Sequence, residues 1–225
     1  MDKQTEYNST LADKFFANFP KDKIVSYNDY WDSVKPKTER EVFQRWLFAF
    51  LSIHTGWESN VKGYQEIKEF EEWENNKELL LEKLKKSGVG LYNNRTKYIW
   101  EFKEKFWKNP KDYMLTTKKY HVKKRDSISD SLNGIGAAKT SFALCMCHPL
   151  TARTLCLDTH VLEMYGMKHL NYQTKTGFAK YKRAEQHWVR NCGKLKVGTE
   201  VARAIFWDEK QGYEDSRYWS HCLES

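Results

Sequence analysis

Residues 127–166 read SISDSLNGIGAAKTSFALCMCHPLTARTLCLDTHVLEMYG, and this stretch decides how the rest of the chain is interpreted. Its first half contains the pentapeptide LNGIG at residues 132–136, between two segments of helical character. Two glycines around one apolar residue allow a sharp turn and a close approach of the backbone to a ligand. The amides of Gly136, Ala137 and Ala138 would then point outward from the start of a new helix. Such a helix start is a favourable place for a DNA phosphate.

The second half of the stretch places Asp158 directly after an apolar run, residues 155–157. An aspartate in this position either caps the helix that follows or is a buried carboxylate that faces a cleft. The two roles can coexist.

These motifs resemble the helix-hairpin-helix and Gly/Pro-Asp signature (HhH-GPD) of DNA glycosylases similar to endonuclease III. The resembling residues are LNGIG, the helix of small residues after it, and LDTHV at residues 157–161. Residues 87–97 (SGVGLYNNRTK) look like a helix junction of that family, and residues 48–67 look like its central helix and the following loop. The resemblance covers residues 38–166, with three motifs in the family's order.

The resemblance implies that the chain flips a damaged or modified base out of double-stranded DNA and breaks its N-glycosidic bond. Bond breaking builds positive charge on the sugar, and a carboxylate can stabilise that charge and direct a nucleophile. The position that matches the family's catalytic aspartate is Asp158. Two alternatives remain open. One is a transferase on the glycosylase fold that modifies thymine in phage DNA, and the other is a non-catalytic DNA-binding module that uses only the hairpin.

Lys139 decides whether strand cleavage accompanies base release. In bifunctional members of the family, a lysine two positions after the second glycine attacks the sugar. Ala138 stands at that position here, and Lys139 follows one residue later, a rotation of about 100° on a helix. Either the hairpin holds an extra residue and Lys139 is the nucleophile of an AP lyase, or water attacks and Lys139 faces a phosphate. A charged side chain on a helix of small residues favours the first interpretation.

Three groups of residues are predicted to contact DNA. His54 and Trp57 follow the central helix, where the family approaches DNA and fills the gap left by the flipped base; ordinary packing is the alternative for each. A charge run before the hairpin, residues 118–125, is either a solvated face or a track for phosphates. The full prediction comprises Asn133, Gly134, Ile135, Gly136, Ala137, Ala138 and Thr140 in the hairpin, His54 and Trp57 in the loop, and Lys123, Lys124 and Arg125 in the charge run. Asn133 replaces the proline usual in the hairpin.

The composition agrees with a folded protein that binds an anionic partner. The 225 residues carry a formal net charge of +8, and 9 Trp, 13 Tyr and 12 Phe argue against disorder. The longest central apolar run, residues 46–51, is too short to span a membrane. We therefore expect a monomeric cytoplasmic protein, associated with the nucleoid and with double-stranded DNA as its partner.

The cysteines predict neither a metal site nor a cluster. Some glycosylases of the resembling family hold an iron-sulfur cluster on four closely spaced C-terminal cysteines, whereas only Cys192 and Cys222 lie beyond residues 127–166 here. Cys145, Cys147 and His148 lack a fourth ligand, so core packing is favoured over metal binding. No cofactor is expected.

The predicted fold class is all-α, because no stretch alternates like a strand. Thr38 to Glu41 forms a capping box that opens a helix to about His54, apolar nearly all round and therefore buried. By the family's architecture, residues 38–166 form one helical lobe with the helix-hairpin-helix at 127–147. Residues 1–37 and 167–225 form the second lobe, and the active cleft lies between the two.

Overall fold

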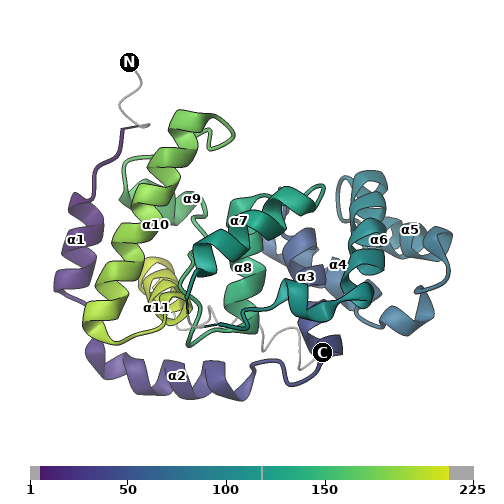
Figure 1. Ribbon diagram of the computed structural model, residues 1–225, viewed down its shortest axis with the longest axis horizontal. Helices are drawn as coiled ribbons and strands as arrows, with labels where there is room; N and C mark the ends of the chain where they lie inside the picture. Colours follow the sequence, from purple (N-terminus) through teal and green to yellow (C-terminus); the bar gives the residue numbers. More distant parts are fainter. Residues whose placement is uncertain (1–5, 118, 213–225) are drawn as a thin grey trace. The chain divides into compact units, whose positions relative to one another are not determined.

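The computed structural model describes residues 6–117 and 119–212, and these form helices, 3-10 turns and loops without a strand (Figure 1). The all-α prediction is confirmed for this part of the chain. The α-helices are α1 (Thr10–Ala17), α2 (Ile24–Ser33), α3 (Glu39–Leu51), α4 (Trp57–Ile67), α5 (Lys77–Lys86), α6 (Tyr92–Lys108), α7 (His121–Ser131), α8 (Ala137–Cys147), α9 (Thr159–Met164), α10 (Lys175–Leu195) and α11 (Thr199–Gln211). The 3-10 turns are η2 (Lys21–Lys23), η3 (Phe70–Glu72) and η4 (Pro110–Tyr113). None of the described helices is both long and apolar enough to cross a bilayer.

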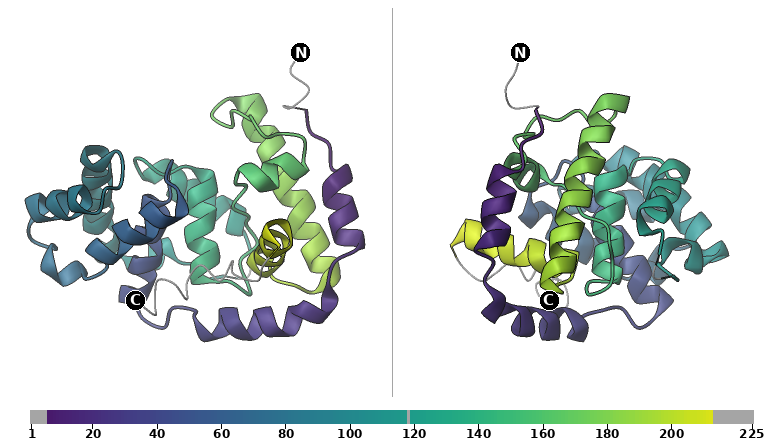
Figure 2. Two further views of the ribbon diagram at one scale, coloured as in Figure 1. Left: turned by 180° about the vertical axis from the view of Figure 1, so that it is seen from behind. Right: turned by 60° about the vertical axis from the view of Figure 1, so that its left-hand side comes forward.

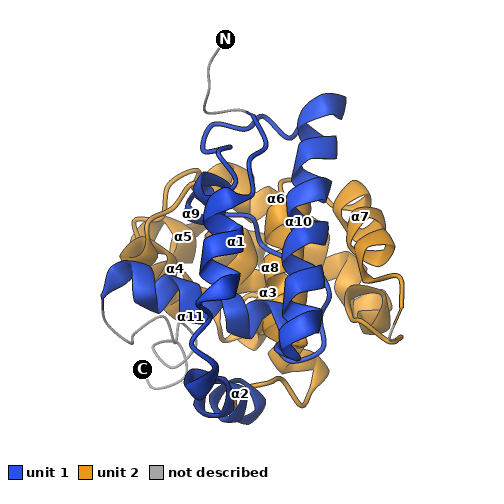
Figure 3. Ribbon diagram, turned by 90° about the vertical axis from the view of Figure 1, so that its left-hand side faces the viewer, with its two compact units in different colours: residues 1–33, 149–216 blue, residues 34–148, 217–225 orange. Residues whose placement is uncertain are grey.

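The chain divides into two compact units, coloured separately in Figure 3. The described part of unit 1 comprises residues 6–33 and 149–212, and that of unit 2 comprises 34–117 and 119–148. The division differs from the expected lobes at two boundaries. Residues 149–166 belong with the terminal segments and not with the hairpin, and residues 34–37 belong with the hairpin unit and not with the terminal segments. The predicted C-terminal boundary at residue 225 lies outside the described residues.

Backbone hydrogen bonds explain why residues 149–166 belong to unit 1. Side chains of helix α10 bind both backbone polar groups of Leu155. The Leu155 amide donates to Glu185 Oε1 at 2.9 Å, and the Leu155 carbonyl accepts from Tyr181 Oη at 2.9 Å. The Thr199 hydroxyl of α11 donates to the carbonyl of Ala152 at 2.9 Å. An extended segment has no backbone partners of its own, so it folds with the helices that supply them.

Helix α3 forms the centre of unit 2, as its apolar circumference predicts. The capping box is present, with the Glu41 amide donating to Thr38 Oγ1 and the Thr38 amide donating to Glu41 Oε2, each at 3.2 Å. All residues from 42 to 51 are buried, and α3 packs against α4, α6 and α8. Figure 1 shows α8 running beside α3, so the helix that carries Lys139 rests on the core of its unit.

Aromatic packing joins α1 to α10 in unit 1, and Figure 2 shows the two helices side by side. The rings of Phe15 and Phe16 lie 5.7 and 4.9 Å, centroid to centroid, from that of Trp188. Leu11, which the helical spacing places on the same face, is 58% exposed and does not share this contact. Tyr27 is buried on α2, which packs against α11.

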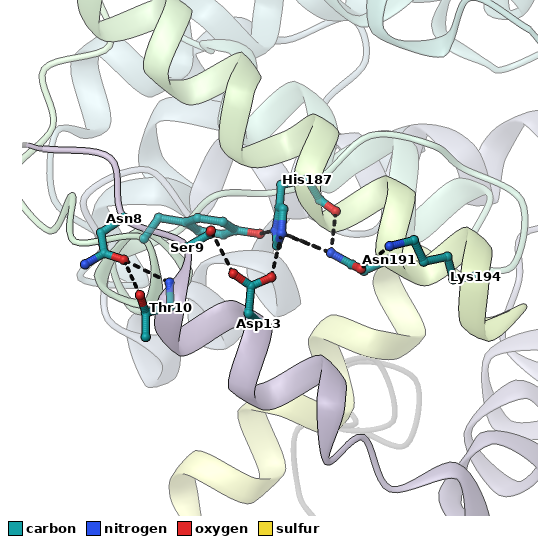
Figure 4. A network of polar contacts seen from close by, with 8 residues as sticks. Asn8, Ser9, Thr10, Asp13, His187, Asn191 and Lys194 are labelled. Carbon is teal, nitrogen blue, oxygen red and sulfur yellow. Dashed lines mark hydrogen bonds and ion pairs between the residues drawn. The ribbon is translucent and has the colours of Figure 1, made fainter.

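A polar network fastens the same helices together (Figure 4). His187 Nδ1 lies 3.0 Å from the hydroxyl of Tyr165, and His187 Nε2 lies 3.0 Å from Asp13 Oδ1. Burial raises the pKa of Tyr165, so its hydroxyl stays protonated and donates to the imidazole. The imidazole then donates from Nε2 to Asp13, whose other oxygen accepts from Ser9 Oγ at 2.8 Å. The network connects α1, α10 and the end of α9.

Candidate functional site

The hairpin between α7 and α8 has the geometry that its two glycines predict. Gly134 has a φ of +76°, a left-handed conformation that glycine adopts without strain, and Gly136 is the extended residue that begins α8. A Cβ built on Gly134 would lie 2.0 Å from Cδ2 of Tyr98. The side-chain Nδ2 of the neighbouring Asn133 donates to Glu101 Oε2 at 2.9 Å, so α6 supports the turn in the absence of the expected proline.

Replacing Gly134 with alanine is expected to destabilise the protein by about 1–3 kcal/mol through the left-handed backbone alone, with a further cost from displacing Tyr98. Thermal denaturation measures the loss, and DNA affinity should fall for all sequences alike, because phosphate contacts carry no sequence information. Gly193→Ala is the matched control, since a Cβ there meets nothing within 4 Å and the residue is helical. A Gly134→Ala protein as stable as this control would contradict the assignment.

The start of α8 offers backbone amides and few side chains. Ile135, Ala137, Ala138 and Thr140 are buried, at 5%, 7%, 6% and 0% exposure. Gly136 supplies no side-chain cap, and the first amide that closes a helical turn is that of Thr140, which donates to the Gly136 carbonyl at 2.9 Å. The preceding amides are therefore the groups with which these residues can bind a phosphate.

Lys139 is the third residue of α8 and is half-buried. Its Nζ lies 5.5 Å from the centroid of the Phe142 ring on the same helix, a cation–π contact. Ala138, one position earlier, faces the interior of unit 2. Of these two neighbours, Lys139 is thus the one with an accessible polar group.

Asp158 caps α9 and keeps one oxygen for other partners. Its Oδ1 accepts from the amides of His160 and Val161, each at 3.0 Å. Its Oδ2 accepts from Arg203 Nη1 at 3.2 Å and from Trp207 Nε1 at 3.0 Å. The side chain is 18% exposed. The capping role and a second role of the carboxylate therefore coexist, as the sequence allows.

The loop after α3 is built around Arg95, which the sequence analysis places in the helix junction without a role. Arg95 Nη1 donates to the carbonyls of Phe50 and Leu51 at 2.7 and 3.0 Å, and Arg95 Nη2 donates to the carbonyl of Ile53 at 2.5 Å. Helix α3 ends at Leu51, before the expected end at about His54, and Arg95 binds the carbonyls at this end. His54 then takes a left-handed φ of 50°.

The model of the family described as 8-oxoguanine DNA glycosylase, with a helix-hairpin-helix, matches residues 22–197. The chain belongs to this family. It is a DNA glycosylase, an enzyme that excises a base from DNA. No curated protein matches it.

Solved structures of archaeal and bacterial enzymes share the fold. The 8-oxoguanine glycosylase/lyase of Methanocaldococcus jannaschii, in complex with 15mer DNA containing 8-oxoguanine, has 21% identity and a TM-score of 0.67, over 89% of this chain and 95% of that one. The 8-oxoguanine DNA glycosylase of Thermotoga maritima has 20% identity and a TM-score of 0.68, over 90% and 97%. The predicted HhH-GPD fold is confirmed.

The charge run before the hairpin of the glycosylase is exposed only in part. Arg125 is fully buried, where it donates from Nη1 to Ser141 Oγ at 2.6 Å and from Nε to Asp126 Oδ1 at 2.7 Å. Its prediction as a DNA contact is wrong, because its guanidinium ties α7 to α8. Lys123 and Lys124 remain near the surface and line a hollow of about 310 Å³. Lys118 of the run lies outside the described residues.

Two other predictions concern Trp57 and His148. Trp57 of the glycosylase is 39% exposed and packs edge-on against Phe48, so it combines packing with an accessible face. His148 Nε2 accepts from the amide of Leu115 at 3.0 Å, and burial lowers the pKa of His148 to about 4, so the ring stays neutral. In the described part of the chain, no three His, Cys, Asp or Glu side chains gather in a way that could hold a metal.

Arg203 and Trp207 are the site residues that the sequence analysis did not find. They lie 45 and 49 residues after Asp158, and Trp207 also packs edge-on against His160, with ring centroids 4.5 Å apart. The available signal was their spacing of four residues on one helix, which places both side chains on the same face. The spacing alone does not identify which carboxylate they bind.

Proposed function

We propose that this glycosylase excises 8-oxoguanine from double-stranded DNA. The family match over residues 22–197 carries the proposal, because the family is named for enzymes that act on 8-oxoguanine. A solved relative with 95% of its length covered was crystallised with DNA that contains 8-oxoguanine, which supports the same substrate. Each unit offers one group that the reaction can use: Asp158 of unit 1 is a carboxylate with an 18% exposed side chain, and Lys139 of unit 2 is a half-buried amine.

The proposed roles follow from the environment of each group. Asp158 stabilises the positive charge that develops on the sugar as the base departs. Lys139 attacks C1′ of the sugar and forms a Schiff base, which makes the enzyme a bifunctional glycosylase/AP lyase. The amides of residues 136–138 bind a phosphate, and His54 and Trp57 contact the DNA where the base is flipped out.

Base release from defined duplexes tests the substrate. Duplexes that differ only in one base, 8-oxoguanine or guanine, are incubated with the enzyme, and mass spectrometry identifies the free base. We expect release of 8-oxoguanine and retention of guanine. Retention of 8-oxoguanine, with release of another damaged base from a third duplex of the same sequence, would contradict the proposed substrate. A mass increase on a base that stays in the DNA would instead support the transferase alternative.

DNA affinity is expected to fall steeply with salt, with a slope of log K against log salt of about −0.9 per neutralised phosphate. Lys123→Gln should reduce that slope by about one if this lysine contacts a phosphate. Lys83→Gln is the charge-matched control, because Lys83 is already paired with Glu72 at 2.5 Å. Fluorescence anisotropy at several salt concentrations measures both. Equal slopes for wild type and Lys123→Gln would remove Lys123 from the interface.

The enzyme is further proposed to act as a monomer, without a cofactor or an iron-sulfur cluster, in the cytoplasm near the nucleoid. The net charge of +8 supports association with DNA, and only Cys192 and Cys222 lie beyond residues 127–166. Gel filtration with light scattering tests the monomer, and iron analysis of the purified protein tests the cluster.

A further inference from the structure

Asp158 is one end of a chain of ion pairs that continues into the interior of unit 1. Its Oδ2 accepts from Arg203 Nη1 at 3.2 Å. The same guanidinium is held from its other edge by Glu200, with Nε to Oε2 at 3.0 Å and Nη2 to Oε1 at 2.5 Å. Glu200 and Arg203 are 0% and 3% exposed, whereas the Asp158 side chain is 18% exposed. Asp158 is thus the member of the chain that a substrate can reach.

The charges of these groups matter for a reaction that creates a cation. An arginine beside Asp158 would by itself offset the negative charge that stabilises the cationic sugar. Glu200 forms a bidentate pair with Arg203 and so compensates the guanidinium. Asp158 and Glu200 each carry one negative charge and Arg203 carries one positive charge, so the three groups together carry one net negative charge. Since the inner pair is buried, that negative charge is presented at Asp158.

The remaining contacts fix the orientation of the carboxylate. Trp207 donates to Oδ2 at 3.0 Å without adding charge, and two backbone amides donate to Oδ1. An ionised carboxylate has about four lone-pair sites, and Asp158 has four donors. Accepting a proton from an incoming nucleophile would therefore displace one of these donors. The arrangement favours a fixed negative charge over a general base.

We propose that Glu200 and Arg203 are positioning residues that hold Asp158 as a fixed, net negative charge toward the reacting sugar. The proposal rests on the catalytic role of Asp158 proposed above. Arg203 supplies orientation and hydrogen bonding, and Glu200 removes the electrostatic cost of having Arg203 there. The two residues should therefore show opposite charge effects that cancel when both are neutralised.

The test compares the single variant Glu200→Gln with the double variant Glu200→Gln/Arg203→Gln. Single-turnover release of 8-oxoguanine and DNA affinity are measured for each. Glu200→Gln leaves an uncompensated guanidinium beside Asp158, so the rate should fall roughly tenfold to hundredfold, as expected for one unit charge several ångströms from the sugar at an effective dielectric constant of about 20. Its DNA affinity should not weaken. The double variant restores the charge balance but loses Arg203 as an orienting donor, so its rate should lie above that of Glu200→Gln and below that of wild type.

Several outcomes would overturn the proposal. A double variant that is as slow as Glu200→Gln would show that the pair acts through packing, and a Glu200→Gln enzyme with the wild-type rate would show that its charge is irrelevant. Thermal denaturation monitors folding, and if Glu200→Gln does not fold, the double variant alone decides: a rate as low as that of Asp158→Asn overturns the proposal. Wild type and Asp158→Asn are measured on the same duplex. Absence of release by wild type is a failure of the proposed function, which is distinguishable from a failure of the ion-pair chain.

Discussion

Asp158→Asn should lower the single-turnover rate of base release by about 100- to 1000-fold, the loss typical of removing one main electrostatic stabiliser. Asparagine keeps the size of the side chain and is itself a good helix cap, so the bonds from the amides of His160 and Val161 can persist. DNA affinity and thermal stability should change little by comparison. Quenched reactions with excess enzyme measure the chemical step without product release.

Glu163→Gln is the matched control for this prediction. Glu163 lies on the same helix, α9, and its carboxylate binds Lys210 and Lys168 at 2.9 and 3.3 Å on the surface. These two lysines lower the pKa of Glu163, so the variant also removes a full negative charge. We expect base release at close to the wild-type rate. A similar loss in both variants would mean that general charge on α9, and not Asp158, supports the reaction.

The parts of this site that depend on neighbouring residues could be predicted from the sequence. The hairpin, the capping box of α3 and the cap at Asp158 each involve residues within a few positions of one another. In each case the residue types at these positions predict the local backbone conformation. Gly134 is an example, since its left-handed backbone excludes most other residues. The order of three such motifs was sufficient to indicate the family and the fold.

The contacts that tune the site join residues far apart in the chain, and no local pattern records them. Arg203 reaches Asp158 across 45 residues, and Arg95 reaches the end of α3 across 44 to 45. Arg125 shows the opposite error: within a run of basic residues it looks like a surface charge, yet it is fully buried. Charge and helical spacing do not show whether a side chain points to solvent or to a partner, because the tertiary packing decides this.

The same limit explains why the lobe boundary after the hairpin differs from the expected one. Residues 149–158 have little regular structure of their own, so the sequence gives no reason to separate them from α8. Their backbone groups bind Glu185, Tyr181 and Thr199, which come from two later helices. Asp158 consequently belongs to unit 1, whereas Lys139 belongs to unit 2. The proposed reaction requires that both reach the same sugar.

Borohydride should trap a covalent adduct between the wild-type enzyme and DNA with an abasic site or 8-oxoguanine, and Lys139→Gln should abolish it. The unprotonated amine attacks C1′, which loses the base, or water at an abasic site. Opening of the C1′–O4′ bond, with O4′ taking up a proton, gives the Schiff base, and β-elimination then removes a C2′ proton and breaks the C3′–O bond. Borohydride adds hydride to the Schiff base and so makes the link permanent. Denaturing gel electrophoresis measures the adduct, and strand cleavage without borohydride should disappear in parallel.

Two further variants make this prediction specific to Lys139. Lys194→Gln removes an exposed lysine from α10, whose Nζ lies 3.5 Å from Asn191 Oδ1, and should leave the adduct unchanged. Ala138→Lys in the Lys139→Gln background moves the amine to the position at which the resembling bifunctional enzymes carry it. If Lys139 occupies the nucleophile's place in this chain, the shift by one residue turns the amine by about 100° and into the buried side of α8, so the adduct should not return. Trapping of equal yield in wild type and Lys139→Gln would exclude Lys139 as the nucleophile. If wild type releases the base but forms no adduct, the enzyme is monofunctional and water is the nucleophile.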